Sequence, residues 1–259
     1  MRKQLFMATR PDPGFRWRGE DVTRLEGLSD AVFGFAITLL VVSLDVPLDF
    51  DDLLRDMRGF LAFGICFAYL VHLWFQHYIY FRRYALESTF VVMCNTFLLF
   101  VVVMYIYPLK FLAGYLLDGV VGLTAPAAGS DSVAPPIIAD DQVGMLMVIY
   151  GVGFVAVSGA FLVLYLYAYR QRELLELNAL ERYDTRESIV AQALKVGIGL
   201  IAIAVAYWGG ANAGLHSGLV YFLVMIPVLI LYGFVSGHKR RQLLVNTHEP
   251  DASHVRGAA

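Results

Sequence analysis

Residues 24–45 read RLEGLSDAVFGFAITLLVVSLD, and this stretch decides how the rest of the chain is interpreted. It is apolar enough to cross a membrane, yet it opens with Arg24, Ser29 and Asp30 and closes on Asp45. Ionisable groups in a membrane helix are costly, so they mark a pathway, a partner or a structural contact. At helical spacing, one face carries Ala31, Phe35, Thr38, Val42 and Asp45. A helix with polar groups at one end and such a face beyond them could line a narrow pore.

The composition is that of a polytopic membrane protein. Of the 259 residues, 58% are hydrophobic and 16% are charged, whereas soluble domains are roughly 25% charged. The sequence has no basic stripe with interleaved aromatic residues, so nucleic-acid binding is not expected. Cys66 and Cys94 fall in different apolar segments and at different depths, so no disulfide is predicted.

Several apolar segments are long enough to cross a bilayer, which needs about 20 residues. They cover roughly residues 24–45, 58–81, 86–108, 144–169, 189–208 and 218–236. The sequence therefore predicts an all-α membrane protein with six transmembrane helices per subunit. In this interpretation residues 1–23 form an N-terminal arm, residues 24–237 the transmembrane domain and residues 238–259 a polar tail.

Arginine and lysine are concentrated in alternate connections. They occur in the N-terminal arm, at Arg82 and Arg83, in residues 170–186 and in residues 239–241. The positive-inside rule therefore predicts that both termini are cytoplasmic, that residues 109–143 form a long extracytoplasmic connection and that residues 170–186 are a solvated cytoplasmic connector. One pore-type helix per chain cannot enclose a channel, so several copies around a common axis are expected.

The predicted orientation places several polar side chains near the cytoplasmic ends of the first three spans. They are Arg24, Ser29, Asp30, Trp74, His77 and Asn95. Buried polar groups in lipid need partners, and these residues supply complementary donors and acceptors. We interpret them as a structural polar cluster that fixes the angle of the first span. Proton sensing at His77 and a proton path through Asp30 and His77 are the alternatives.

Three short elements of the sequence resemble those of one channel family. Residues 24–30, RLEGLSD, resemble the RxxxFSD signature that opens the first helix of the transmembrane protein 175 potassium channel family. Trp74 and His77 match the Trp-x-x-His element of its second helix. Asn95 and Pro108 match an asparagine near the start, and a proline at the end, of its third helix. The motifs cover the first three spans, and the six-span layout covers the whole chain.

The resemblance implies a potassium-selective channel (K+ over Na+) that lacks the TVGYG filter of ordinary potassium channels. It implies that the first helix lines a central pore. By this resemblance the pore-lining residues are Phe35 and Val42 at the constriction and gate and Thr38 as the selectivity layer. Ala31 and Asp45 lie on the same helix face and are expected at the pore mouths. A single six-span unit looks like the prokaryotic members, which implies a homotetramer in the plasma membrane of a prokaryote.

Two positions depart from the family pattern. Leu28 stands where the signature has phenylalanine, and Phe35 stands where the family usually has isoleucine or leucine. Four phenyl rings at one level could close the axis or rotate aside to open it. Ordinary helix packing of Phe35 and Thr38, a proton-conducting channel, a secondary transporter of small cations and a membrane enzyme are the alternatives. No nucleophile, base or metal ligands converge outside the polar cluster, so we expect no catalysis, metal site or cofactor, and the expected partners are K+, the lipid bilayer and further copies of the chain.

Overall fold

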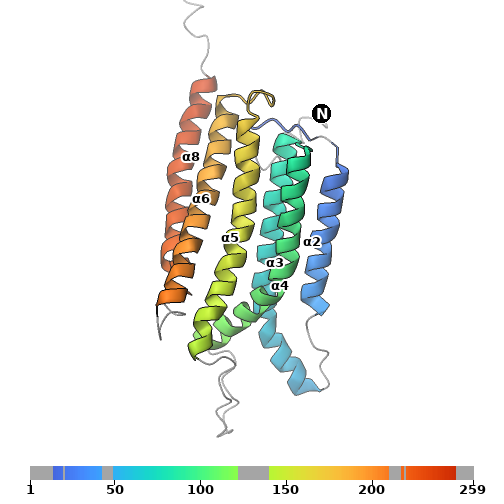
Figure 1. Cartoon of the computed structure of the whole chain (residues 1–259), viewed down its shortest axis with the longest axis vertical. Helices are drawn as coiled ribbons and strands as arrows, with labels where there is room; N and C mark the ends of the chain where they lie inside the picture. Colours follow the sequence, from blue (N-terminus) through green and yellow to red (C-terminus); the bar gives the residue numbers. More distant parts are fainter. Residues whose placement is uncertain are drawn as a thin grey trace, which may run out of the picture.

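The computed structural model describes residues 14–19, 21–42, 49–121, 140–209, 217–218 and 220–248. These residues form six long α-helices and one π-helical stretch (Figure 1). The elements are α2 (Arg24–Val42), α3 (Phe50–Tyr84), α4 (Thr89–Val121), α5 (Asp140–Arg170), α6 (Ala179–Trp208), η2 (Val220–Met225) and α8 (Ile226–His248). The prediction of an all-α fold is confirmed for this part of the chain.

Three of these helices are long and apolar enough to cross a membrane, among the residues that the structure describes. The segments are Thr89–Leu112, Gln142–Arg170 and Ala179–Trp208. In α2, Arg24, Glu26 and Asp30 all fall within the first two turns, so this 19-residue helix has three charged residues near its start. Six spans and two cytoplasmic termini therefore stay predictions.

The helices stand side by side, with α2 at one edge and α8 at the opposite edge (Figure 1). Helices α5 and α6 pack along each other, and α4 packs against α5, α2 and α3. The described N-terminal segment and the last turns of α8 lie at the same end of the bundle (Figure 1). We call this the basic end, because it carries Arg82, Arg83, Arg170, Arg182 and Arg240.

Helices α3, α4, α6 and α8 extend well beyond the predicted apolar segments. Helix α6 begins at Ala179 because Asn178 and Glu181 form a capping box ahead of the apolar run. Helix α8 continues to His248, so residues 238–248 are helical rather than part of an irregular tail. Both extensions are polar, and a polar sequence continues a helix as well as an apolar one does.

Helix α4 runs through Pro108, where the sequence predicts the end of a span. Proline has no N–H and clashes with the preceding turn, so it bends a helix that continues past it. Beyond the proline, the backbone N–H of Leu112 donates to the Tyr150 hydroxyl of α5 at 2.8 Å. Figure 1 shows this last part of α4 running across the lower end of α5. The 109–143 connection thus begins within α4 and ends within α5, and its residues 122–139 lie outside the described residues.

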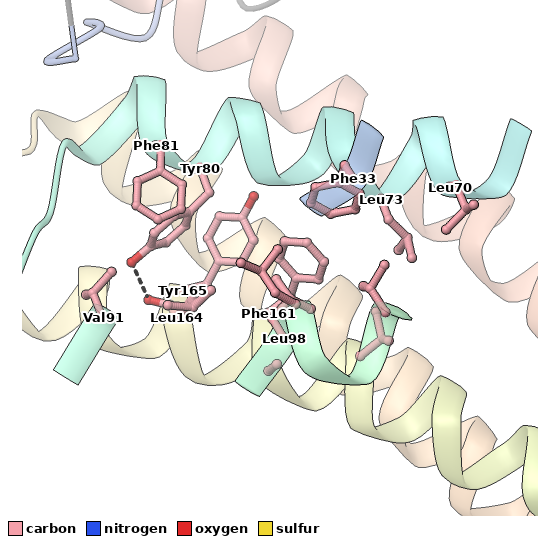
Figure 2. Close-up of a cluster of buried hydrophobic side chains, with 14 of the residues drawn as sticks. Phe33, Leu70, Leu73, Tyr80, Phe81, Val91, Leu98, Phe161, Leu164 and Tyr165 are labelled. Carbon is pink, nitrogen blue, oxygen red and sulfur yellow. Dashed lines mark hydrogen bonds between the residues drawn. The ribbon is translucent and has the colours of Figure 1, made fainter. Parts of the chain in front are cut away.

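The core lies where α3, α4 and α5 meet (Figure 2). Tyr80 of α3 is fully buried, and its hydroxyl donates to the Leu164 carbonyl of α5 at 3.1 Å. The Tyr80 and Tyr165 rings meet edge to face at 5.4 Å. Phe33 of α2 joins the same cluster. In a membrane such close packing and interhelical hydrogen bonding hold helices together, so this core fixes which face of α2 is buried.

Candidate functional site

Helix α2 has two faces of opposite character. The buried face carries Ser29, Phe33, Ala36 and Leu40. The exposed face carries Ala31, Gly34, Phe35 and Thr38. Each set follows the spacing of three or four residues that defines one side of a helix. The Phe35 side chain is 57% exposed on the single chain, so this apolar face is available to line a pore or to meet another copy.

The Thr38 hydroxyl is oriented by its own helix. Its Oγ1 donates to the carbonyl oxygen of Phe35 at 2.7 Å. Because the hydroxyl hydrogen is used inside the helix, the oxygen lone pairs remain available on the exposed face. Val42 is the last residue of α2, and its side chain lies outside the described part. Asp45 also lies outside the described residues.

Three polar side chains from α2, α3 and α4 form one buried hydrogen-bond chain. His77 Nε2 lies 2.8 Å from Asn95 Oδ1, and Asn95 Nδ2 donates to Ser29 Oγ at 2.9 Å. Ser29 in turn donates to the Leu25 carbonyl at 2.8 Å. Since the Asn95 amide nitrogen donates to Ser29, its oxygen accepts, which places the hydrogen on His77 Nε2. Asn95 thus links all three helices.

Trp74 and Asp30 form a second, separate contact. The indole nitrogen of Trp74 donates to Asp30 Oδ1 at 2.8 Å, at the exposed side of the subunit. Together with the chain through Asn95, this bond ties α2 to its neighbours on two sides. It also lies at the exposed face of α2, because Asp30 is itself exposed and stands four residues before Gly34 of that face.

Arg24, which the sequence predicts as a member of the polar cluster, does not join it. Its side chain is exposed, and it makes no hydrogen bond or ion pair within the part of the chain that the structure describes. Side chains of a helix lean toward its N-terminus. Arg24 is the first residue of α2, so its side chain leaves the helix end in the direction away from Ser29.

Sequence reasoning missed the residues that hold the start of α2. The Glu26 N–H donates to Thr23 Oγ1 at 3.2 Å, and the Thr23 N–H donates to Glu26 Oε2 at 2.9 Å, which makes a capping box. The Arg82 guanidinium of α3 lies 3.8 Å from the Glu26 carboxylate. The Thr-x-x-Glu pattern before an apolar run is a helix-start signal that could have found the first of these contacts.

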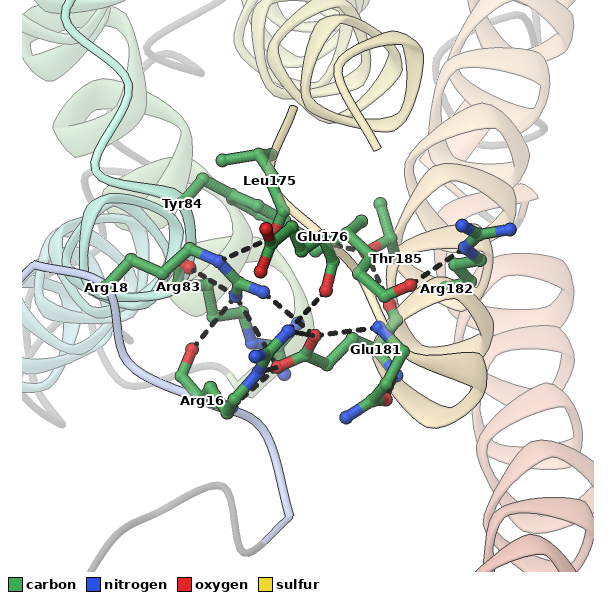
Figure 3. A network of polar contacts seen from close by, with 11 residues as sticks. Arg16, Arg18, Arg83, Tyr84, Leu175, Glu176, Glu181, Arg182 and Thr185 are labelled. Carbon is green, nitrogen blue, oxygen red and sulfur yellow. Dashed lines mark hydrogen bonds and ion pairs between the residues drawn. The ribbon is translucent and has the colours of Figure 1, made fainter. Parts of the chain in front are cut away.

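The segment of residues 15–19 lies between the end of α3 and the start of α6 (Figure 3). The Glu181 carboxylate, which is 0% exposed, lies 3.1 Å from Arg16 Nε and 2.9 Å from Arg18 Nη2. Arg18 Nε also donates to the Leu175 carbonyl at 3.0 Å. The hydrogen bond to Glu181 raises the pKa of the Arg16 guanidinium above its ordinary value. We call residues 15–19 together with Glu181 the N-terminal clasp.

The backbone of the clasp also contacts α3. The N–H groups of Arg18 and Gly19 both approach the Arg82 carbonyl, at 3.0 and 3.3 Å. A β-carbon at residue 19 would lie 3.1 Å from the Phe81 carbonyl oxygen, so this close approach favours glycine. Part of the N-terminal arm is therefore bound to the bundle, since two arginines find a buried acceptor there.

The interpretation of residues 170–186 as a solvated connector is wrong for its last part. Glu181, Asp184 and Thr185 are buried. Arg240 of α8 lies 2.9 Å from the Asp184 carboxylate. Charged residues are rarely buried without partners, and here each carboxylate faces at least one guanidinium. The basic end is thus held by ion pairs between segments that are distant in the sequence.

A third polar chain connects α3 with α6. Gln192 Nε2 donates to Gln76 Oε1 at 2.8 Å, and Gln76 Nε2 lies 2.7 Å from His72 Nε2. Gln76 directly precedes His77 in α3. Helix α3 is therefore bonded to Asn95 of α4 through His77 and to α6 through Gln76. Among the described residues, no group of His, Cys, Asp and Glu side chains could hold a metal ion.

Polar side chains hold α2 on one side and leave its other face open, an arrangement compatible with a subunit of a membrane channel. A family model described as "Endosomal/lysosomal potassium channel TMEM175" matches residues 24–105. A protein of Marivirga tractuosa named "Potassium channel" is 38% identical over 250 residues, which cover 94% of this chain and 99% of that protein. The chain belongs to the TMEM175 family, a family of potassium channels and not of enzymes. The family predicted from the sequence is confirmed.

Two solved structures are similar to this one. The crystal structure of a variant of the potassium channel MtTMEM175, in complex with a nanobody–MBP fusion protein, matches with a TM-score of 0.74 at 37% identity. The match covers 88% of this chain and 98% of that chain. A lysosomal potassium-selective channel TMEM175 homolog from Chamaesiphon minutus matches with a TM-score of 0.51 at 24% identity, over 82% of this chain and 96% of that chain. The second likeness concerns the fold alone.

Proposed function

We propose that this protein is a potassium-selective channel whose pore is lined by the exposed face of α2. The observation that carries the proposal is the division of α2 into a face buried by α3 and α4 and an open face with Phe35 and Thr38. The relatives named potassium channels support K+ as the permeant ion. In this proposal the protein lies in the plasma membrane of a prokaryote with the basic end in the cytoplasm, as the positive-inside rule favours.

Assembly follows from the single pore helix of each chain. One α2 cannot surround an ion path, and closed rotational symmetry is the usual solution. We propose a homotetramer in which four copies of the exposed face turn toward a common axis. The two polar contacts of α2, through Ser29 and through Asp30, set the rotation of the helix and thereby which side chains reach the axis. Native mass spectrometry should give the mass of four chains.

The proposed pore has an apolar constriction followed by a layer of hydroxyl groups. Four Phe35 rings at one level would form a narrow neck, which gates by dewetting because an ion must shed water to pass. Potassium holds its water less tightly than sodium does, so such a neck favours K+. The Thr38 oxygens, with their hydrogens bonded to the Phe35 carbonyl, would replace part of the lost water shell. In this proposal Val42 forms a further apolar layer, and Asp45 at the outer mouth concentrates cations.

The polar cluster favours a structural role over a proton path. His77 is buried and directs its Nε2–H to Asn95. The chain continues through Ser29 and stops at the Leu25 carbonyl, which cannot pass a proton on. A cluster of this kind orients helices, and the exposed face of α2 is left as the route for an ion.

The test is ion flux from liposomes that contain the purified protein. Wild type should pass K+ faster than Na+. Phe35→Ala should raise K+ flux and lower the preference for K+ over Na+, because it widens the neck. Phe100→Ala, which shortens an exposed phenylalanine of α4, is the matched control and should behave as wild type. The proposal fails if neither wild type nor Phe35→Ala conducts, or if K+ and Na+ pass equally well through wild type.

A further inference from the structure

A groove runs along the outside of the bundle between α4 and α5 and holds about 470 Å³. No atom of another segment lies within 4 Å of the position that a β-carbon would take at Gly159, so the space above this glycine is unfilled. Small residues of α5 form the floor and large residues of α4 form one wall. They are Ala156, Gly159 and Ala160 on the floor, and Phe90, Met93 and Phe97 on the wall.

The chemistry of the groove selects an apolar occupant of extended shape. Apart from the thiol of Cys94, its lining consists of apolar side chains and glycine. Along α5 the lining runs from Val155 to Val163, a rise of roughly 12 Å at 1.5 Å per residue. A hydrocarbon chain lying parallel to the helices fits these dimensions, whereas a polar molecule would lose its hydrogen bonds to water there.

An arginine stands at the basic end of the same side of α5. Val163, Tyr167 and Arg170 follow one another at intervals of four and three residues, which places them on one helix face. Tyr167 contacts the ring of Phe90 at 4.8 Å, so this face continues the groove. Arg170 lies roughly 10 Å beyond Val163 toward the basic end, where lipid headgroups would meet the protein.

Arg170 differs from the other arginines of this region in its contacts. Its side chain is exposed, and it makes no hydrogen bond, ion pair or ring contact within the described ranges. Arg172 and Arg186 both lie over the Tyr169 ring, each at 5.2 Å. A guanidinium is the side chain best suited to bind a phosphate through two parallel hydrogen bonds. Arg170 thus supplies the charge that a phosphate at the end of an acyl chain requires.

We propose that this groove binds a phospholipid, with one acyl chain along the small residues of α5 and the phosphate at Arg170. The apolar lining would contact the acyl chain, and the guanidinium of Arg170 would bind the phosphate of the headgroup. Basic residues at a membrane surface attract anionic lipids, so phosphatidylglycerol is a suitable probe. The inference requires a membrane protein but is independent of which ion the channel conducts.

The test measures lipid bound to the detergent-solubilised full-length protein by native mass spectrometry after addition of phosphatidylglycerol. Gly159→Leu fills the floor of the groove, and Arg170→Gln removes the headgroup contact. Each should weaken lipid binding roughly tenfold, the effect of losing about 1.4 kcal/mol of contact. Gly197→Leu, at another open glycine on α6, and Arg241→Gln, at an exposed arginine of α8, are matched controls and should bind lipid as wild type does. Ala156→Leu fills the same floor and replaces Gly159→Leu if that variant does not fold.

Several results would overturn the proposal. Lipid binding unchanged in both site variants would show that the groove holds no specific lipid. A loss of binding in only one of the two variants would show that the groove and Arg170 do not bind the same lipid molecule. Displacement of the lipid by inorganic phosphate alone would show a simple anion site. A groove variant that lowers the number of chains per particle would show an interface between copies. Potassium flux through wild type and Phe35→Ala tests the channel function separately. A failure of the lipid proposal therefore leaves the proposed channel function unaffected.

Discussion

At the scale of single residues, Asn95 is the side chain that joins three helices. It accepts a hydrogen bond from α3 and donates one to α2, while its own backbone belongs to α4. A side-chain amide can do both at once, because it carries an acceptor and a donor on one planar group. A single, fully buried residue of α4 therefore links α2 to α3.

We predict that Asn95→Leu destabilises the protein by about 1–3 kcal/mol, because His77 loses its acceptor and Ser29 loses its donor at a buried site. The change would appear as a lower midpoint of thermal unfolding, measured by gel filtration with fluorescence detection. Thr96→Val is the control, since this neighbouring hydroxyl is exposed and bonds only within its helix, to the Val92 carbonyl. Equal shifts in the two variants would contradict the assigned role of Asn95.

At the scale of elements, the N-terminal clasp joins the entry of α2 to α6. Glu181 caps its own helix through Asn178 and also receives Arg16 and Arg18. In the sequence, only residues 20–22 separate the clasp from the capping box at Thr23 and Glu26.

We predict that Glu181→Gln lowers the stability of the protein by about 2 kcal/mol or more, because one buried carboxylate serves two guanidinium groups. Glu173→Gln is the matched control. Glu173 is 73% exposed and pairs with Arg172 and Arg182 at 3.4 and 3.6 Å. Exposed pairs contribute roughly 0–1 kcal/mol, so thermal unfolding should barely change. If the two variants lose the same stability, the clasp is no stronger than a surface contact.

The sequence predicts the helices and the polar cluster around Asn95, because both follow from depth in a membrane. Ser29, His77 and Asn95 fall at one level once the spans are assigned, and the structure brings them together. Helix ends are predicted less well, because an apolar run marks only the part of a helix that lies inside the bilayer and not where the helical backbone begins or ends. The start of α6 depends on the cap at Asn178.

The pairing of Arg16 and Arg18 with Glu181 joins residues about 165 positions apart in the sequence. No local pattern reports a contact of that separation. Arg24 stands outside the polar cluster of the single chain for a different reason: depth alone does not give the direction in which a side chain leaves its helix.

At the scale of the whole molecule, α2 stands at one edge of the subunit and is covered on one side only (Figure 1). The proposed tetramer explains this arrangement, because the open face of α2 meets three further copies around the axis. The packed core of α3, α4 and α5 then supports α2 on the side away from the axis. The central claim is that the face with Phe35 and Thr38, and not the opposite face, meets the ion path.

The measurement that tests this claim most directly is block of potassium flux by a water-soluble, positively charged thiol reagent. The background replaces Cys66 and Cys94, both free in the structure, with alanine. Thr38→Cys places a thiol on the exposed face, and Leu40→Cys places one two residues away on the buried face. We predict that the reagent, present on both sides of the membrane, abolishes K+ flux through Thr38→Cys and leaves Leu40→Cys unaffected. Block of Leu40→Cys without block of Thr38→Cys would contradict the assignment of the pore face.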